Sequence, residues 1–422
     1  MTCVRRLLAQ GGSPRGWGPI LLFLLGAGTL AAQQLVAGPG TPSPCTTSPL
    51  ALDTLATGLS IPWDVAFLPD GRALVTERTG SIRLIDAAGR VDPEPWAVLD
   101  VFAQSESGLM GIDARPSPDV PGALDVYVTA TIEVELGRNP LSRMLRGASR
   151  SLARAWDPDR GQARYMRVYR LREVDGVVSG PEIVVDRLPS AHVHAGGAIR
   201  LGPDGMLYVS KGDAGDPRWA QDPESTRGKI LRYTPDGAIP PDNPFPGSPV
   251  WASGARDSQG LAWHPETAEL FAIEHGPSGA EHEGFRVHDD ELSAVPPGAN
   301  LGWPLATGYT EGGGLTSPVM VWTPSIAPGG LTFYDAPGSA WTGSAFVTAL
   351  RGASLRRLEL EPGPDGWRVV CEEVLLRDAY ARLRLVRQAP DGTLWVGTSN
   401  RDQSGIPREG SDLILRLHPP TS

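Results

Sequence analysis

The sequence predicts an all-β fold, a six-bladed β-propeller of four-stranded antiparallel blades, and three observations support this prediction. First, 51 Gly and 41 Pro among 422 residues leave little uninterrupted chain for long helices. Second, 12 Trp, 8 Phe and 8 Tyr accompany recurrent apolar segments that can build a core, which argues against a disordered chain. Third, one pattern of strands and tight turns recurs six times along the chain.

Each copy of the repeat begins with an apolar or aromatic strand and passes through a Pro-Asp-Gly or similar turn to a second short strand. After a variable loop it ends in a strand of alternating Arg and aliphatic residues. At the turn, Asp caps the corner with its side chain and Gly takes the positive φ that joins two antiparallel strands. The six copies are expected at 61–86, 108–173, 194–237, 256–276, 327–360 and 382–420.

An alternating segment, 48–59, precedes the first copy. We expect it to supply the outer strand of the last blade, because this would close the ring and protect an open strand edge. Loops on one face of a closed propeller converge near its central channel. Residues that are far apart in the sequence can therefore meet there.

The N-terminal residues 1–32 are typical of an export signal. A positive region with three Arg precedes the apolar run 20–30, and the small residues Ala31 and Ala32 follow. This pattern predicts a periplasmic or secreted protein, with an uncleaved N-terminal anchor as the open alternative. The expected organisation is a signal at 1–32, a linker at 33–50, and a propeller domain at 51–420 with an Arg-rich insertion at 137–164.

Two cysteines, Cys45 and Cys371, lie outside the predicted signal. In an exported protein they could form a disulfide between the N-terminal segment and a late part of the chain, as a ring-shaped fold would favour. Two separate thiols remain the alternative, because spacing in the sequence does not establish proximity.

Two histidines, His192 and His194, open the segment that is richest in candidate catalytic groups, 191–215. On a strand both side chains would point to one face, a spacing that could bind a metal ion. Asp213, after the next predicted strand, could orient a histidine on the same face. The alternatives are a loop histidine without a chemical role and a carboxylate that only caps its turn.

A second polar segment spans 274–284. Its His275, Glu281, His282 and Glu283 resemble a transition-metal set only loosely, whereas the Gly-Pro turn that follows His275 offers backbone carbonyls to a hard cation such as calcium. A solvated acidic loop is the alternative interpretation.

Arginines near strand ends are the third feature. The formal net charge of −10 disfavours nucleic-acid binding, which requires a positive surface. Arg256, Arg351, Arg382 and Arg384 nevertheless lie near strand ends of late blades. If they gather on one face, they suit a ligand that carries several carboxylates. Decoration of exposed outer strands is the alternative.

An ordered series of motifs runs from 194 to 304, within a resemblance to a known family that extends over 56–419. It consists of HAGG, GPDGMLYV, GDAGDP, GKILRYTPDGAIPPDNPF, RDSQGLAWHP, EHGPSG and NLGWP. In order and spacing this series resembles the soluble aldose dehydrogenases that depend on pyrroloquinoline quinone (PQQ), the glucose/sorbosone dehydrogenase family. The resemblance implies a six-bladed propeller, in agreement with the repeat count.

The resemblance also implies roles for particular residues. His194 matches the catalytic base and Asp213 the carboxylate that orients it, while Arg256 matches the arginine over the reactive carbonyl of the quinone. Gly276 and Pro277 match backbone-carbonyl ligands of Ca²⁺. The remaining matches are polar or basic residues around the cofactor or the reacting centre: Glu106, Arg351, Arg382 and Arg384.

One position departs from the family pattern. Asp257 stands where relatives often have Asn, and a carboxylate near a tricarboxylate cofactor is unfavourable unless it is protonated, turned away or bound to calcium. Asp257 is therefore included among the candidate cofactor-binding residues, with these three alternatives open.

The leading hypothesis is an exported dehydrogenase that uses PQQ and Ca²⁺ to oxidise aldose sugars to lactones, with a cytochrome or quinone as the unidentified electron acceptor. A non-enzymatic propeller that binds a saccharide or a protein is the second hypothesis. A metal-dependent lactonase is the third, and the sequence lacks the ring of inward-facing acids that it would require.

Overall fold

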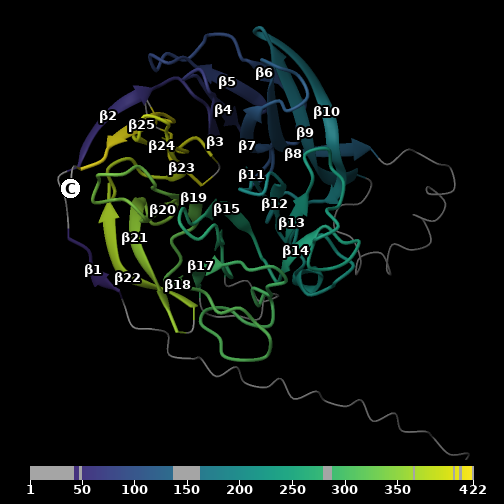
Figure 1. Ribbon diagram of the computed structural model, residues 1–422, viewed down its shortest axis with the longest axis vertical. Coiled ribbons are helices and arrows are strands. Elements are labelled where there is room, and N and C mark those ends of the chain that lie inside the picture. Colours follow the sequence, from purple (N-terminus) through teal and green to yellow (C-terminus); the bar gives the residue numbers. More distant parts are fainter. Residues whose placement is uncertain are drawn as a thin grey trace, which may run out of the picture. The chain divides into compact units, whose positions relative to one another are not determined.

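The computed structural model describes residues 42–46, 50–135, 162–278, 288–364, 366–402, 404–407 and 411–420. These residues form six small antiparallel sheets arranged around a common channel, which confirms the predicted six-bladed propeller (Figure 1). The predicted export signal at 1–32 and residues 137–161 of the Arg-rich insertion lie outside the described residues. Residues 162–164, assigned to the end of that insertion, already belong to a strand.

The first three blades follow the predicted copies. Blade one contains β3 (Pro62–Phe67), β4 (Ala73–Glu77), β5 (Ser81–Ile85) and β6 (Ala97–Val98). Blade two contains β7 (Leu109–Pro116), β8 (Leu124–Glu135), β9 (Gln162–Val174) and β10 (Val177–Pro189). Blade three contains β11 (Gly196–Leu201), β12 (Leu207–Lys211), β13 (Lys229–Tyr233) and β14 (Val250–Ser253).

The last three blades have the same antiparallel order. Blade four contains β15 (Ser258–Trp263), β16 (Leu270–Glu274), β17 (Asp290–Ala294) and β18 (Met320–Trp322). Blade five contains β19 (Pro328–Phe333), β20 (Ala345–Ala349), β21 (Ser354–Gly363) and β22 (Gly366–Leu375). Blade six contains β23 (Leu383–Gln388), β24 (Leu394–Thr398) and β25 (Ile414–His418). Among the described residues the one helical element is a single 3₁₀ turn, Pro217–Ala220, and no helix there is long or apolar enough to cross a bilayer.

The ring closes through the strand that the sequence predicts for this purpose. Strand β2 (Ala51–Ala56) pairs antiparallel with β25, with Leu52 opposite Leu417, and becomes the outer strand of blade six (Figure 1). The N-terminal part of the propeller is thus hydrogen-bonded to its last strand, which gives blade six its fourth strand and covers the edge of β25.

A second N-terminal strand lies within the segment predicted as a linker. Strand β1 (Ser43–Pro44) pairs parallel with β22 at the outer edge of blade five, where Ser43 lies opposite Cys371. Beside it Cys45 and Cys371 form a disulfide, which selects the paired alternative over two separate thiols. The segment 33–50 therefore contains more structure than a linker.

The Asp-Gly corners have the predicted geometry. Gly71, Gly205 and Gly392 have φ of 86°, 77° and 82°, which places them in the left-handed region. The preceding Asp accepts a hydrogen bond from the backbone N–H two residues further on, at 3.0 Å between Asp204 Oδ1 and the Met206 nitrogen. Side chain and glycine together reverse the chain between the first and second strands of a blade.

The first strand of each blade lies innermost, and consecutive inner strands contact one another around the full ring: β3 with β7, β7 with β11, β11 with β15, β15 with β19, β19 with β23, and β23 with β3. This close approach explains the Gly-Gly pair at the start of β11. A Cβ at Gly197 would lie 2.6 Å from Met110 Sδ on the neighbouring inner strand. Glycine is therefore required at this junction between β7 and β11.

Removal of the disulfide tests the role of β1. We expect the double variant Cys45→Ala, Cys371→Ala to lose about 2–4 kcal/mol of unfolding free energy, because the crosslink closes a long loop in the unfolded chain. Denaturant melts monitored by tryptophan fluorescence measure the loss. Wild-type protein melted with reductant should match the variant, and an unchanged midpoint in both would contradict the prediction.

Candidate active site

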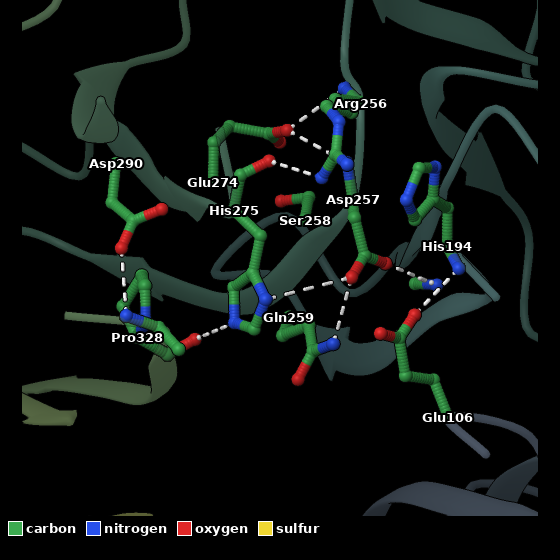
Figure 2. Close-up of polar contacts among 12 residues, drawn as sticks. Glu106, His194, Arg256, Asp257, Ser258, Gln259, Glu274, His275, Asp290 and Pro328 are labelled. Carbon is green, nitrogen blue, oxygen red and sulfur yellow. Dashed lines mark hydrogen bonds and ion pairs between the residues drawn. The ribbon is translucent and has the colours of Figure 1, made fainter. Parts of the chain in front are cut away.

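A cavity of about 750 Å³ opens at one end of the channel and is lined by residues from all six blades. Its lining residues lie mostly just before the first strand or just after the second strand of a blade. In an antiparallel pair these two ends lie on the same side of the sheet. Blade architecture therefore brings His194 and Arg256, from strand starts, together with Arg78 and His275, from strand ends (Figure 2 shows His194, Arg256 and His275).

The imidazole of His194 lies on the cavity wall with its side chain 14% exposed, and Nδ1 lies 2.6 Å from Asp213 Oδ1. An ionised carboxylate can only accept hydrogen bonds, so Nδ1 carries the proton and Nε2 is the basic nitrogen. Asp213 is fully buried and also accepts a hydrogen bond from the Gly215 nitrogen at 2.7 Å. The pair has the arrangement of a base and its orienting carboxylate.

The backbone around His194 holds the ring in place. His194 has φ of 48°, a left-handed conformation that is uncommon for a residue with a side chain. Its N–H donates to Glu106 Oε2 at 2.5 Å, across the junction between blades two and three (Figure 2). A Cβ on Gly212 would collide with the carbonyl oxygen of His194, so glycine is required beside it. Strained backbone that several contacts hold in place is typical of functional sites.

The pKa of His194 is raised above its ordinary value. Burial by itself would lower this pKa, but the hydrogen bond to Asp213 and the negative charges of Asp213 and Asp257 outweigh burial and the opposing charge of Arg256. The pKa of Glu106 is also raised, by burial and by the charge on Asp257. The site therefore contains a basic imidazole next to a carboxyl group that is easily protonated.

Arg256 lies on the adjacent wall and is 5% exposed. Its Nη1 donates to the carbonyl oxygen of His275 at 3.1 Å and its Nη2 to Ser278 Oγ at 3.1 Å (the bond to His275 is drawn in Figure 2). Its backbone N–H donates to Glu274 at 2.9 Å. Both the main chain and the guanidinium are thus fixed before any ligand binds.

Asp257 does not line the cavity. It is fully buried behind the wall, where Oδ1 accepts from the Gly196 nitrogen at 2.9 Å and Oδ2 accepts from Gln259 Nε2 at 2.8 Å. Burial by itself would raise its pKa, but the charges on His275 and His194 and the bond to Gln259 hold the pKa below its ordinary value. Of the three sequence alternatives, the structure shows a carboxylate turned away from the cavity.

Two deeper carboxyl groups have strongly raised pKa values. Burial raises the pKa of Glu274 to about 8, although the backbone N–H groups of Arg256 and Asp257 donate to it. Burial also raises the pKa of Glu291 to about 8. At neutral pH both groups bind a proton for most of the time, which limits the negative charge behind the Arg256 wall.

The far wall of the cavity is cationic. Arg78, Arg351, Arg382 and Arg384 all line it. Arg382 pairs with Asp402 at 3.0 Å, whereas Arg384 stacks 3.9 Å over the Trp63 ring and donates to Gln259. Burial lowers the pKa of Arg384 to about 10, which leaves it charged at neutral pH.

Some donors on this wall are not satisfied. Within the described residues the buried Nε atoms of Arg78 and Arg384 have no hydrogen-bond acceptor. No carboxylate of the described chain pairs with the Arg351 guanidinium either. The buried Nε atoms cost free energy without facing the cavity, whereas the Arg351 guanidinium lines the cavity and is available to an anionic ligand.

Gly276 and Pro277 line the cavity between Arg256 and Asp290. The Gly276 N–H donates to Asp290 Oδ1 at 2.9 Å, and a Cβ at Gly276 would collide with the Asp289 carbonyl. No donor in the described ranges bonds to the carbonyl oxygen of Gly276 or Pro277. Oxygen donors of this kind suit a hard cation such as Ca²⁺.

The structure gathers nearly all of the predicted residues at one site. His194, Arg256, Glu106, Gly276, Pro277, Arg351, Arg382 and Arg384 line one cavity, and Asp213 lies directly behind His194. His192 is exposed and contributes only its carbonyl, which accepts from the Glu106 nitrogen. Glu281, His282 and Glu283, considered as metal ligands, lie outside the described residues.

Several lining residues were not anticipated: Arg78, Gln259, Asp290, Asn400 and Asp402. A comparison of equivalent positions between repeats could have found Arg78, Asn400 and Asp402. Each follows the second strand of its blade, as Asp213 and His275 do. Gln259 could have been found from its place two residues after Asp257, at the start of β15.

Comparison with known proteins gives four relevant similarities. A family model described as glucose/sorbosone dehydrogenase matches residues 59–408. Among curated proteins, an uncharacterized protein of Synechocystis sp. is 30% identical over 384 residues, covering 82% of this chain and 83% of its own. The aldose sugar dehydrogenase YliI of Escherichia coli is 29% identical over 391 residues, covering 87% of this chain and 92% of its own.

A solved structure gives a similar result. The PQQ-bound aldose sugar dehydrogenase of Streptomyces coelicolor has a TM-score of 0.71 and 33% sequence identity, covering 89% of this chain and 99% of that chain.

The Asp213 carboxylate can be tested through the titration of His194. In Asp213→Asn the pKa of His194 should fall below its ordinary value of 6.5, because burial and the Arg256 charge are then opposed only by the smaller effect of Asp257. NMR of histidine-labelled protein measures the titration, with His194→Gln to assign the signal. Asp204→Asn, an outer-turn change in the same blade, is the control, and an unchanged titration in Asp213→Asn would contradict the assignment.

Proposed function

Because the chain belongs to the glucose/sorbosone dehydrogenase family, we propose that it oxidises the anomeric carbon of aldose sugars to lactones with PQQ as cofactor and His194 as general base. The observation that carries this proposal is the shared cavity. His194 before β11, Arg256 before β15, and Gly276 and Pro277 after β16 all line the same space of about 750 Å³.

The residues of the cavity fit a multiply anionic cofactor. Five guanidinium groups line it (Arg78, Arg256, Arg351, Arg382 and Arg384), against the carboxyl groups of Glu106, Asp290 and Asp402. Asp402 is already paired with Arg382, and Asp290 accepts from Gly276, Ser325, Ile326 and Ala327. The cavity therefore retains positive charge for the carboxylates of the quinone, and Arg351, which pairs with no carboxylate of the described residues, supports the same fit.

The Gly276–Pro277 segment fits a calcium ion. Two neutral carbonyls are fewer than the roughly six to eight oxygen ligands that Ca²⁺ takes, so the cofactor and water would supply the rest. Asp290 cannot easily contribute, because four donors from the protein already occupy its carboxylate.

The chain's own residues then perform the proton transfer. Nε2 of His194 takes the proton of the anomeric hydroxyl, while Asp213 keeps the other proton on Nδ1 and stabilises the imidazolium that forms. Arg256, fixed by His275 and Ser278, holds positive charge on the neighbouring wall, where negative charge develops. When bound, PQQ would supply the two-electron acceptor for the hydride of the anomeric carbon, and Ca²⁺ would supply a Lewis acid that polarises the quinone.

We also propose that the protein acts outside the cytoplasm and passes its electrons to a cytochrome or quinone acceptor. The Cys45–Cys371 disulfide supports an oxidising compartment, since such bonds are rare in reducing ones. The sequence pattern at 1–32 supports export.

Reconstitution of the apoprotein tests the proposal. With PQQ and Ca²⁺ added, dye reduction should appear with at least one member of a panel of aldoses, and His194→Gln should lower turnover by about 10²–10⁴-fold. The acid limb of the kcat/KM profile should lie above the ordinary histidine pKa, because the neutral imidazole is the active form and its pKa is raised. A folded wild-type protein that reduces no dye with any sugar would instead favour the saccharide- or protein-binding propeller.

The cationic wall can be tested without turnover. Arg351→Met should weaken PQQ binding by roughly 10- to 100-fold, since it removes a charged hydrogen-bond donor from an anion site. Quenching of tryptophan fluorescence during titration with PQQ measures the affinity. Arg351→Lys should lose less, and Arg368→Met, at an exposed pair with Glu361 in blade five, should lose nothing. Equal PQQ affinities of Arg351→Met and wild type would show that Arg351 does not bind the cofactor.

A further inference from the structure

We propose that Trp303 is a positioning residue that couples the histidine base to the Arg256 guanidinium. The proposal rests on the proposed function for its kinetic consequence but not for its structural one. Trp303 is 4% exposed, belongs to the loop between β17 and β18, and lies behind the cavity wall. The indole N–H donates a hydrogen bond to Asp213, and one face of the indole ring contacts the Arg256 guanidinium.

The indole N–H completes the hydrogen bonding of Asp213. Oδ1 of this carboxylate is occupied by His194 at 2.6 Å and by the Gly215 nitrogen at 2.7 Å. Oδ2 accepts from Trp303 Nε1 at 2.9 Å, and in the part of the chain that the structure describes this indole is its one donor. Trp303 therefore restricts rotation of the buried carboxylate and holds its plane in the orientation that faces His194.

The face of the same indole supports Arg256. The guanidinium carbon lies 5.5 Å from the ring centroid, within the range of a cation–π contact. The Asp213 nitrogen also donates to the Arg256 carbonyl at 2.8 Å, so the two residues are linked through their backbones as well. Base and guanidinium, which come from different blades, thus share one support.

Trp303 is itself held firmly. The backbone N–H of Trp303 donates to the Gly254 carbonyl at 3.0 Å, and the backbone carbonyl of Trp303 accepts from Gln221 Nε2 at 2.7 Å. Gln221 also exchanges hydrogen bonds with Asn300, at 2.9 Å and 2.8 Å. The Asn300–Trp303 turn is therefore fixed to the end of the Asp216–Gln221 loop of blade three, and the indole has little freedom to follow Asp213 if that side chain turns.

The direction of the effect follows from the chemistry of the carboxylate. Each hydrogen bond donated to Asp213 stabilises its negative charge and makes it a weaker partner for imidazolium. Loss of the indole N–H should therefore raise the pKa of His194 further. A larger share of the enzyme would hold protonated His194 at neutral pH, and the carboxylate would orient the ring less strictly.

Trp303→Phe tests this inference, because it keeps an aromatic face for Arg256 and removes only the N–H. We expect the His194 titration to move to higher pH, the acid limb of kcat/KM to move with it, and kcat to fall roughly tenfold with little change in KM. Trp322→Phe is the matched control. Trp322 is 5% exposed and donates to Glu372 at 3.0 Å in the outer part of blade four, away from the cavity.

Trp322→Phe should lower stability by a similar amount and leave both pH profiles in place. If Trp303→Phe behaves like Trp322→Phe, Trp303 is structural only and the proposal fails. In wild-type protein one indole N–H resonance should titrate with the same midpoint as His194 and should stop doing so in Asp213→Asn. This measurement needs no tryptophan variant, and the absence of such a resonance would also overturn the proposal.

The two NMR readouts do not depend on enzyme activity. If reconstituted wild type shows no dehydrogenase activity but the His194 titration responds to Trp303→Phe, the proposed function fails while the coupling stands. If activity is present and the titration does not respond, only the coupling fails.

Discussion

Antiparallel pairing of β2 with β25 is the constraint on which the rest of the structure depends. It joins the N-terminal part of the propeller to its last strand and completes blade six. Once the ring is closed, the starts of the inner strands and the ends of the second strands lie at one end of the channel. Arg78 of blade one and Arg384 of blade six, 306 positions apart in the sequence, then border one cavity. The disulfide between Cys45 and Cys371 fastens the neighbouring blade in the same way.

Positively charged groups lie on the wall of the cavity, and most of the carboxyl groups lie behind that wall. Guanidinium groups lie on its wall, where Arg351 remains available to an anion. Carboxyl groups behind the wall are either paired, as Asp257 is with Gln259, or have raised pKa values, as Glu274 and Glu291 do. A cavity in a protein of net charge −10 can in this way keep a positive lining for a carboxylate-rich ligand.

The negative charge of Asp257, the residue that departs from the family pattern, is compensated by groups close to it. Its carboxylate accepts from Gly196, at the start of the strand that follows His194, and from Gln259, whose own oxygen accepts from Arg384. Asp257 is therefore connected on one side to the backbone near the base and on the other to the cationic wall. The negative charge that seemed incompatible with an anionic cofactor is directed into the protein, where these donors and two histidines balance it.

The sequence by itself determined those features of the fold that depend on residues close together in the chain. Alternating apolar strands and Asp-Gly corners are local signals, so the blade count, the closing strand and the glycine turns could be predicted. The motif series also predicted roles for His194, Asp213 and Arg256 by resemblance.

Only the tertiary structure decided which way side chains turn and what meets across blades. Asp257 turns inward, Ser43–Pro44 forms an edge strand, and Trp303 reaches Asp213 across 90 positions of sequence. Such contacts are set by ring closure and by the packing of loops from adjacent blades. A local pattern carries no information about them, because the distance between two blades is fixed only when all six have assembled.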